Sequence, residues 1–576
     1  MTAFVIENMA PIMFASLVLL LLLGYPVAFA LAANGLVFAI IGIELGLFPP
    51  VFLQALPERI FGIMNNDTLL AIPFFTFMGL ILERSGMAED LLDTVGQLFG
   101  PVRGGLAFAV VLVGALLAAT TGVVAASVIA MGLISLPIML RYGYDRRVAS
   151  GVIAASGTLA QIIPPSLVLI IMADQLGRSV GDMYEGAIIP GLVLTGLYMS
   201  YIGIIALRYP KAAPALPIEA RTLGGGVTSL FVLVALSVAA GYVIITYFGQ
   251  GVTEKGIWGA TVSIAIAYAI ALINRALSLG LLSRLAQQVI IVLMPPLALI
   301  FLVLGTIFLG IATPTEGGAM GAVGALLLAI SKNRLSFSLL RQALDATTKL
   351  SAFVLFILIG ARVFSLTFYG VNGHVWVEHL LLSVPGGELG FLIVVNILVF
   401  ILAFFLDFFE LAFIVVPLLA PVADKLGIDL IWFGVLLSVN LQTSFMHPPF
   451  GFALFYLRSV APRDPYIDKI TGRRIAPVTT AEIYWGAVPF VLIQVIMVGL
   501  TIAFPQMVTH YKSTGTGVDP ASIEIKLQPF GGQQGAPAFQ DFGAPPPGLG
   551  GQPGSGTAPA PAPAPGPDLS QPPKFN

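Results

Sequence analysis

Long apolar runs separated by short polar loops fill the chain from residue 10 to residue 505. Runs such as "MFASLVLLLLL", "LFVLVALSVAAGYVIITYF" and "VPFVLIQVIMVGLTIAF" contain no charged residue. A helix needs about 20 apolar residues to cross the hydrocarbon core of a bilayer. We therefore expect an all-α multispan membrane protein, with spans at 10–24, 26–45, 67–84, 148–177, 184–207, 225–247, 256–274, 287–310, 314–331, 350–369, 430–457 and 482–505.

Two further apolar segments, 104–140 and 388–424, are interrupted at their centres by "ATTGVVAAS" and "FFLDFFELAF". Such a segment can leave and return on one side of the membrane, provided that protein covers its irregular backbone. We expect two re-entrant hairpins, and a pair of short full spans in each segment is the alternative.

The composition excludes several function classes. Only 10% of the 576 residues are charged and 57% are hydrophobic, whereas soluble domains carry about 25% charged residues. The absence of cysteine excludes disulfides, thiolate zinc sites and iron–sulfur ligation. A net charge of −2 gives no sign of a nucleic-acid partner. The chain has no His-Glu-x-x-His motif and no Walker A loop, so we expect neither enzymatic activity nor a cofactor.

The distribution of the basic residues predicts how the chain is oriented across the membrane. If the N-terminus lies outside, most of the 27 Lys and Arg residues fall in cytoplasmic loops, as the positive-inside rule requires. The C-terminal tail, 507–576, then also lies outside. From about Ser513 it consists largely of Gly, Pro, Ala and Gln, which cannot bury a core, so we expect it to be disordered.

The chain contains an internal repeat. "PIMLRYGYDRRVASGVIAASGTLAQIIPPS" aligns without a gap on "PVADKLGIDLIWFGVLLSVNLQTSFMHPPF" at a constant offset of 284 residues. Five coincidences support it: Pro137/Pro421, Gly143/Gly427, Asp145/Asp429, Pro164/Pro448 and Pro165/Pro449. We expect a first repeat at 1–209, a two-span connector at 210–286 and a second repeat at 287–506. An odd number of crossings separates the two repeats, so the second is inverted, as in many secondary transporters.

Each repeat carries a double proline inside a span, at Pro164-Pro165 and at Pro448-Pro449. Proline is tolerated in the first turn of a helix, so we expect Pro164 and Pro448 to start the second halves of two broken helices, within 148–177 and 430–457. Helix N-termini favour a carboxylate, and the freed carbonyl and side-chain oxygens before the prolines favour Na⁺.

Several motifs resemble the large membrane subunit of TRAP transporters, the DctM-type permeases. They are "LLAIPFFTFMGLIL", "RGGLAFAVV", "LPIMLRYGYD", "GTLAQIIPPS", "GIATPTEGGAMGAV" and "FLDFFELAFIVVPLLAPV", and the resemblance covers about 1–506. It implies a Na⁺-driven importer of the bacterial inner membrane that works by an elevator motion. It also implies two partners, a small DctQ-type membrane subunit and a DctP-type periplasmic solute-binding protein, and a periplasmic N-terminus and tail. A stand-alone Na⁺/anion symporter or exporter of the same architecture is the alternative.

The resemblance also places candidate Na⁺ ligands at the hairpin tips and helix breaks. They are Thr120, Thr121, Gly122, Gly157, Thr158, Gln161, Ile162, Leu406, Asp407, Asn440, Thr443, Ser444 and Met446. The sequence departs from many relatives at "TTGVVAAS" and at "QTSFMHPPFGFALF". In these places it is similar to the branch often labelled mannitol/chloroaromatic.

The candidate contacts of an organic acid substrate are Pro164, Ser166, Arg362, His447 and Pro448. Arg362 is the one basic residue placed inside a span, where an arginine needs a partner. It binds the substrate carboxylate, or pairs with Asp407 or Glu410, or extends to the membrane surface. His447 either donates to a carboxylate, carries a proton or is structural. The apolar faces elsewhere are expected to contact lipid.

Overall fold

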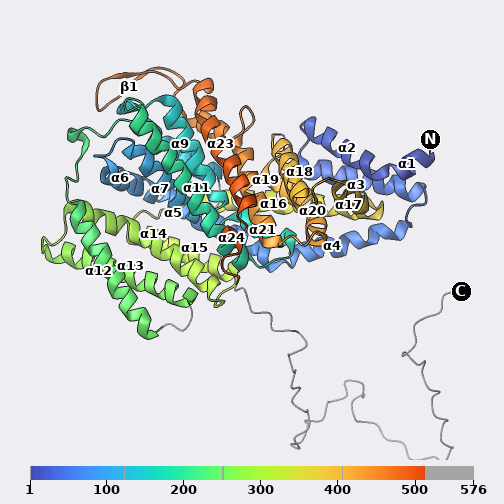
Figure 1. Ribbon diagram of the computed structural model, residues 1–576, viewed down its shortest axis with the longest axis horizontal. Coiled ribbons are helices and arrows are strands. Elements are labelled where there is room, and N and C mark those ends of the chain that lie inside the picture. Colours follow the sequence, from blue (N-terminus) through green and yellow to red (C-terminus); the bar gives the residue numbers. More distant parts are fainter. Residues whose placement is uncertain (1, 122–123, 249–251, 405, 513–576) are drawn as a thin grey trace, which may run out of the picture. The chain divides into compact units, whose positions relative to one another are not determined.

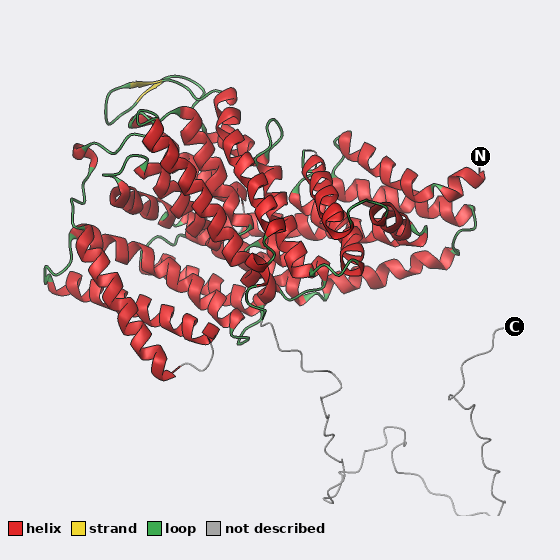
Figure 2. Ribbon diagram, viewed as in Figure 1, coloured by secondary structure: helices red, strands yellow, loops and turns green. Residues whose placement is uncertain are grey.

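The computed structural model describes residues 2–121, 124–248, 252–404 and 406–512, and most of these residues are helical (Figures 1 and 2). By length and composition, eight of the described helices can cross a membrane, or up to ten elements if each of two bent helix pairs counts as one span. The prediction of an all-α multispan membrane protein is confirmed. The expected tail lies outside the described residues from 513 onward.

The first part of the chain contains more helices than the apolar runs predict. Helices α4 and α5 form a pair bent by 48°. Neither α4 nor α6 was expected, because α4 carries charged residues and α6 is an amphipathic helix with two acidic residues in its first turn. The elements are α1 (Thr2–Glu7), α2 (Met9–Leu22), α3 (Val27–Glu44), η1 (Pro50–Gln54), α4 (Ala55–Met64), η2 (Asp67–Leu70), α5 (Ala71–Arg84), α6 (Met87–Phe99), α7 (Gly105–Thr121), α8 (Val124–Arg141), α9 (Arg146–Thr158), η3 (Leu159–Gln161), α10 (Leu167–Leu176) and α11 (Val180–Arg208).

In the remainder, helix α16 is 34 residues long and begins well before the expected span at 350–369. The apolar pattern did not predict its first turns, because they are polar. Helices α17 and α18 form the second bent pair, at 117°. The elements are η4 (Ile218–Ala220), α12 (Val227–Phe248), α13 (Val252–Leu277), α14 (Arg284–Phe308), α15 (Pro314–Ser331), α16 (Phe337–Gly370), α17 (Gly373–Leu382), α18 (Gly387–Leu402), α19 (Phe408–Glu410), the π-helix η5 (Leu411–Val415), α20 (Val416–Lys425), α21 (Leu430–Leu441), η6 (Gln442–Phe445), α22 (Phe452–Val460), β1 (Tyr466–Ile467), β2 (Arg474–Ile475), α23 (Thr480–Ala503) and α24 (Gln506–Thr509).

Glycines allow the most extensive helix contacts. A Cβ atom on Gly151 would lie 2.1 Å from the carbonyl oxygen of Gly486, and one on Gly486 would lie 2.2 Å from that of Arg147. Helices α9 and α23 therefore pack backbone to backbone (Figure 1). A Cβ on Gly360 would lie 2.4 Å from the Ala28 carbonyl oxygen, which brings α16 equally close to α3. Small residues at such interfaces are typical of helix packing in membranes.

The glycine, aspartate and proline residues that coincide in the repeat have the same local structure in both halves. Gly143 and Gly427 follow α8 and α20 with left-handed φ values of +82° and +74°, which suits glycine. Asp145 and Asp429 are N-caps, and each carboxylate accepts from the N–H groups of the second and third helical residues of α9 and α21. Both Pro–Pro bonds are cis.

Equivalent helices of the two halves also make equivalent contacts. At the 284-residue offset, α9 corresponds to α21 and α10 corresponds to α22. Helix α10 packs against α21, and α9 packs against α22. Likewise α7 contacts α9, and α18 contacts α21. A two-fold relation between the halves produces this exchange, and it brings both broken helices together.

The loop before α23 forms a small hairpin of β1 and β2 (Figure 2), and Asp468 anchors it. Its carboxylate accepts from Arg141 Nε at 2.9 Å and from the N–H and hydroxyl of Thr471 at 2.8 and 2.7 Å. Burial raises the pKa of the Asp468 carboxyl, but these hydrogen bonds outweigh burial and lower the pKa to about 2. The ion pair joins the loop to the end of α8.

Candidate functional site

The first break lies between α9 and α10. After η3 the chain leaves the helix, and Pro164 and Pro165 are buried in the non-helical turn. Ser166 caps α10: its hydroxyl accepts from the Val168 N–H at 3.2 Å and donates to the Gln161 carbonyl at 2.6 Å. The side chain of Ser166 thus connects the end of η3 to the first turn of α10 across the break.

The second break, between α21 and α22, has the same order of elements but a different cap. Gly451 occupies the N-cap position, and no side chain caps it. The expectation that Pro164 and Pro448 start the second half-helices is wrong, because α10 begins at Leu167 and α22 at Phe452. A residue that precedes a proline is disfavoured in the helical region, so neither first proline can open a helix.

A buried hydrogen-bond network joins the two breaks. Thr158 and Gln442 are equivalent at the 284-residue offset, and the Gln442 amide donates to Thr158 Oγ1 at 3.2 Å. The Gln494 amide, from α23, donates to the same oxygen at 3.4 Å and to the Tyr198 hydroxyl at 2.9 Å. All four residues are buried. Equivalent residues of two halves related by a two-fold axis touch only near that axis, so this contact is the one expected where such an axis passes.

Three amide oxygens around this network are unsatisfied. The Oε1 atoms of Gln161, Gln442 and Gln494 are buried and have no hydrogen-bond partner among the described residues. A buried polar atom without a partner costs about 1–3 kcal/mol. Water or a hard cation such as Na⁺ can satisfy such oxygens. One of the three oxygens belongs to the first break, one to the second and one to α23, so the region between the breaks offers acceptors for a cation or for water.

The first hairpin tip is described in part. The backbone of Thr120 and Thr121 belongs to α7, and Gly122 lies outside the described residues. Gly157 holds α9 against the second arm of this hairpin, because a Cβ there would lie 2.3 Å from the Val128 side chain and 3.1 Å from its backbone nitrogen. Ile162 is fully buried, and its N–H donates to the carbonyl of residue 159.

The second hairpin tip is a carboxylate pair. Asp407 Oδ1 accepts from the Glu410 N–H at 3.1 Å, and Glu410 Oε2 accepts from the Asp407 N–H at 3.0 Å, which is a capping box. Leu406, immediately before it, is buried. The local capping explains why these two residues occur together in the sequence.

The polar residues of the second break are tied to backbone. The Asn440 amide donates to the carbonyl and the side-chain oxygen of Asn396 at 2.8 and 3.0 Å, which joins α21 to α18. The hydroxyls of Thr443 and Ser444 donate to carbonyls three residues earlier, at 2.6 Å each. The Met446 N–H donates to the Thr443 carbonyl at 2.8 Å. Each hydroxyl oxygen keeps lone pairs for a further donor or a cation.

A central cavity of about 260 Å³ lies where the hairpins and the broken helices meet. Among the predicted site residues, Gln161 and Asp407 line it. Helix α16 contributes Phe353, and α22 contributes Tyr456, neither of which the sequence singled out. Its lining is Val124, Ala125, Gln161, Leu167, Val168, Leu350, Phe353, Asp407, Phe408, Phe409, Phe445, Phe452 and Tyr456.

The walls of the central cavity are related by the repeat. Four lining residues of the first half have equivalents, 284 positions later, that also line the cavity. In every pair the second-half residue is phenylalanine and the first-half residue is smaller. The pairs are Val124/Phe408, Ala125/Phe409, Gln161/Phe445 and Val168/Phe452. We call the four phenylalanines the aromatic wall.

His447 is a packing residue of the second hairpin. Its ring stacks on Phe404 at 4.2 Å between centroids and 10° between planes, and meets the edge of Phe400 at 4.3 Å. The side chain is buried. The half-buried Pro448 follows it, and neither residue lines the central cavity.

Arg362 lies at a second cavity, of about 220 Å³, together with Arg59, Gln175, Ser365 and Tyr369. Among the described residues no ion pair involves Arg362, so the predicted alternative of a pair with Asp407 or Glu410 is not found. Nine residues separate it from the central-cavity residue of the same helix at position 353, which is a rise of about 13 Å. The structure thus separates Arg362 from the central cavity.

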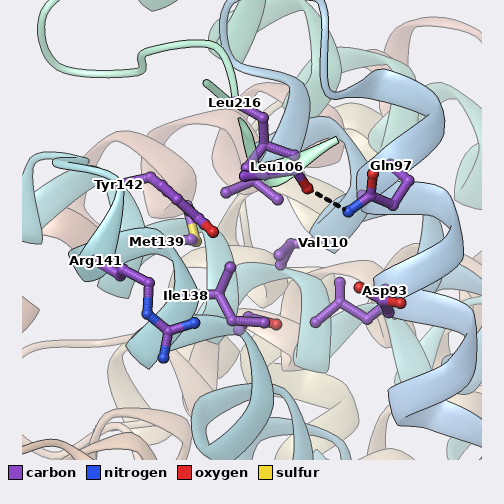
Figure 3. A pocket seen from close by; sticks show the side chains of 13 residues that line it. Asp93, Gln97, Leu106, Val110, Ile138, Met139, Arg141, Tyr142 and Leu216 are labelled. Atoms are coloured by element: carbon purple, nitrogen blue, oxygen red, sulfur yellow. Dashed lines mark hydrogen bonds between the residues drawn. The ribbon is translucent and has the colours of Figure 1, made fainter. Parts of the chain in front are cut away.

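A third cavity, of about 100 Å³, lies between α6, α7, α8 and the segment after α11 (Figure 3). Its lining is mainly apolar, with Asp93 and Arg141 on opposite sides. The Gln97 amide donates to the Ala220 carbonyl at 2.9 Å, and Arg141 is already paired with Asp468. No break or hairpin-tip residue lines it, so we assign it a structural role.

The family model and the curated relatives agree on one family. Residues 14–507 match the family model described as "Tripartite ATP-independent periplasmic transporter, DctM component". The C4-dicarboxylate TRAP transporter large permease protein DctM of Pseudomonas aeruginosa is 29% identical over 466 residues, which are 80% of this chain and 91% of the relative.

Relatives named for other substrates are nearly as similar. The ectoine/5-hydroxyectoine TRAP transporter large permease protein UehC of Ruegeria pomeroyi is 25% identical, over 87% of this chain and 97% of the relative. The isethionate TRAP transporter permease protein DctMQ of Oleidesulfovibrio alaskensis is 25% identical, over 78% and 60%. The solved YdaH transporter of Alcanivorax borkumensis aligns with a TM-score of 0.45 and 14% identity, over 78% and 87%.

Proposed function

The chain belongs to the DctM family of large permeases of tripartite ATP-independent periplasmic transporters, and we propose that it uses a Na⁺ gradient to import a small organic acid anion. The observation that carries the proposal is the pair of helix breaks, joined on a pseudo-two-fold axis by Thr158 and Gln442 and surrounded by unsatisfied buried oxygens. A dry membrane interior tolerates such oxygens where they bind ions or water.

We place one Na⁺ at each break. The first site uses oxygens of the 157–162 segment with the tip of the first hairpin, and the second uses those of the 440–446 segment with the tip at Asp407. Two Na⁺ ions with one monocarboxylate carry net positive charge inward, which gains about 2.3 kcal/mol per 100 mV of inside-negative potential. The coupling ions therefore supply the driving force in place of ATP.

The anion site we propose is the central cavity. Leu167 and Val168 of α10 and Phe452 of α22 line it, so the N-termini of both second half-helices approach it. Helix N-termini attract carboxylates through their free N–H groups and partial positive charge. Among the residues that line this cavity, the one charged side chain is Asp407, so recognition of the carboxylate falls to backbone N–H groups and bound Na⁺.

An elevator motion suits this arrangement. Helix α16 packs on α3, α4 and α5 and lines both the central cavity and the Arg362 cavity. The other walls of the central cavity come from the hairpins and the broken helices. We propose that these elements move as one body along α16, within the bacterial inner membrane and with a periplasmic N-terminus.

Two partners complete the proposed transporter: a small membrane subunit of DctQ type and a periplasmic solute-binding protein of DctP type. The name of the DctMQ relative supports the first, because it places both permease parts in one protein. The alternative is a stand-alone symporter or exporter.

Proteoliposomes containing this chain and the small subunit test the proposal. With the binding protein and a panel of labelled organic acids outside, uptake should require Na⁺ and should stop when K⁺ replaces it. Uptake at the same rate in K⁺ would refute Na⁺ coupling. Uptake that persists without the binding protein would support the stand-alone symporter.

A further inference from the structure

The asymmetry of the central cavity indicates which organic acids fit it, and this inference rests on the proposed function. We propose that the substrate carries a planar apolar body, of the size of a phenyl ring, attached to its carboxylate. Four pairs of equivalent positions line the cavity, yet the second half contributes the four phenylalanines of the aromatic wall and the first half contributes two valines, an alanine and Gln161.

Aromatic side chains favour particular ligands. Phenylalanine rings attract planar apolar groups through offset or edge contacts, which add about 0.5–1.5 kcal/mol to the burial of their area. Phe353 and Tyr456 extend the aromatic lining beyond the wall itself. A short dicarboxylate would leave these faces uncovered and would place its second carboxylate near the rings and near Asp407, without a basic side chain among the lining residues.

The small side of the cavity provides the space that the body needs. Ala125 and Val168 occupy positions where the second half has phenylalanine, so these positions leave more room than their second-half equivalents. Leu167 and Val168 also belong to the first turn of α10, which approaches the carboxylate end. We therefore orient the substrate with its carboxylate toward the helix N-termini and its body against the rings.

The repeat supplies the variants for the test. Phe445→Gln and Phe452→Val give the second half the residues that already occupy the equivalent positions of the first half. Phe391→Leu is the matched control, because Phe391 is buried in α18 against Phe433 and does not line the cavity. Acetate and phenylacetate are the probes, since they share a carboxylate and differ by one ring.

Binding is measured as the rise in melting temperature of the purified protein with increasing acid, in Na⁺ and in K⁺. We expect phenylacetate to bind at least about tenfold more tightly than acetate in Na⁺. The two cavity variants should reduce this ratio several-fold, and the control should preserve it. Equal binding of the two acids, no binding of either, or an unchanged ratio in the cavity variants would overturn the inference.

The same measurement separates this inference from Na⁺ coupling. If both acids bind alike but require Na⁺, the coupling stands and the aromatic substrate is refuted. If phenylacetate binds as tightly in K⁺ as in Na⁺ and keeps its advantage over acetate, the aromatic wall stands and the coupling is refuted.

A second inference rests on a different observation, the composition of the Arg362 cavity. We infer that this cavity binds the carboxylate of a small anion at a site separate from the central cavity. Arg59, Arg362, Gln175, Ser365 and Tyr369 all offer hydrogen-bond donors, and no Asp or Glu lines the cavity among the residues that the structure describes. Two guanidinium groups at one cavity repel each other, and a bound anion would offset this repulsion.

The carboxylate of Asp174 does not line this cavity. Asp174, adjacent to Gln175, accepts from the amides of Asn66 and Gln175 at 2.6 and 2.7 Å. Tyr369 is held in place by the ring of His374, stacked at 4.7 Å. Both arginines come from α4 and α16, whereas Gln175 belongs to α10, so a bound anion would contact both sides of the boundary along which we propose the motion.

The absence of cysteine from the chain allows a direct test. Ser365→Cys introduces a single thiol into the cavity, and Ser383→Cys introduces one at an exposed position after α17. The thiols are labelled with an anionic and with a cationic methanethiosulfonate reagent. We expect the anionic-to-cationic rate ratio to be about tenfold higher at residue 365 than at residue 383, and to fall when Arg59→Gln or Arg362→Gln is added.

Two sources of carboxylate-like anions are distinguished by competition. Succinate should slow labelling of Ser365→Cys in vesicles of phosphatidylcholine, without effect on Ser383→Cys. Protection by added phosphatidylglycerol but not by succinate would assign the cavity to a lipid headgroup and overturn the inference, as would equal rate ratios at the two thiols. No transport is measured, so the result does not depend on the proposed function.

Discussion

Replacing Gly486 by alanine should destabilise the protein, because α9 and α23 leave no room for a methyl group. The new Cβ would lie 2.2 Å from the Arg147 carbonyl oxygen and 3.0 Å from Ser150 Oγ. A carbon approaches a carbonyl oxygen to about 3.3 Å at best, so the helices must separate by about 1 Å. Overpacking of this kind costs about 1–3 kcal/mol.

The same helix provides the control. A Cβ on Gly499 would meet nothing within 4 Å, and alanine is a better helix former than glycine by up to about 1 kcal/mol. Thermal unfolding of the purified protein should therefore show a lower midpoint for Gly486→Ala and an unchanged or higher one for Gly499→Ala.

A functional readout follows from the position of Gln494, two turns from Gly486 on α23, where it donates to Thr158 on α9. Separation of the helices should weaken this contact and with it the stabilisation of the protein by Na⁺. Equal midpoints for the two alanine variants would refute the reasoning about backbone contact. A destabilised Gly486→Ala with unchanged Na⁺ response would refute the link to the helix break.

Thr158→Val should lower the unfolding free energy by about 2–4 kcal/mol, because two buried amides lose their acceptor. Thr195→Val is the control, because it removes a hydroxyl bonded only to its own helix. It should cost less in the same melting experiment. His447→Phe should leave both melting temperature and uptake near the wild-type values, since the ring packs through its faces, and loss of uptake would show that the imidazole nitrogens are required. The depressed pKa of Asp468 stabilises its loop above about pH 4, and this stabilisation is lost as the pH falls toward 2. Limited proteolysis between β1 and β2 should therefore increase over that range, whereas Asp468→Asn should be cleaved readily at every pH.

Much of the fold can be read from local sequence signals. Thr313, Pro314 and Glu316 form a capping box with proline at the first helical position, and the sequence "TPTEGG" contains all three parts. The two aspartates at the repeat offset cap equivalent helices for the same reason. Helices α4 and α6 could not be found in this way, because charged and amphipathic helices lack an apolar run.

The candidate site was predictable only in part, because a motif locates a segment but not the direction of its side chains. The tip and break segments were identified, yet Gln161 and Asp407 alone among the predicted residues line the central cavity. Arg362 was expected there because its charge lies inside a span, and its distance along α16 became visible only with the helix bounds. The similarity to the branch often labelled mannitol/chloroaromatic stays a prediction.

The contact between Thr158 and Gln442 has a consequence for the ancestry of the chain. In a symmetric dimer, a residue on the two-fold axis touches its own copy. If the two halves descend from one duplicated gene, the ancestral residue at this position had to hydrogen-bond to itself across the axis. Two threonines or two glutamines can do so, since each side chain both donates and accepts. After gene fusion the two copies could diverge, and the threonine–glutamine pair is such a divergence at equivalent positions.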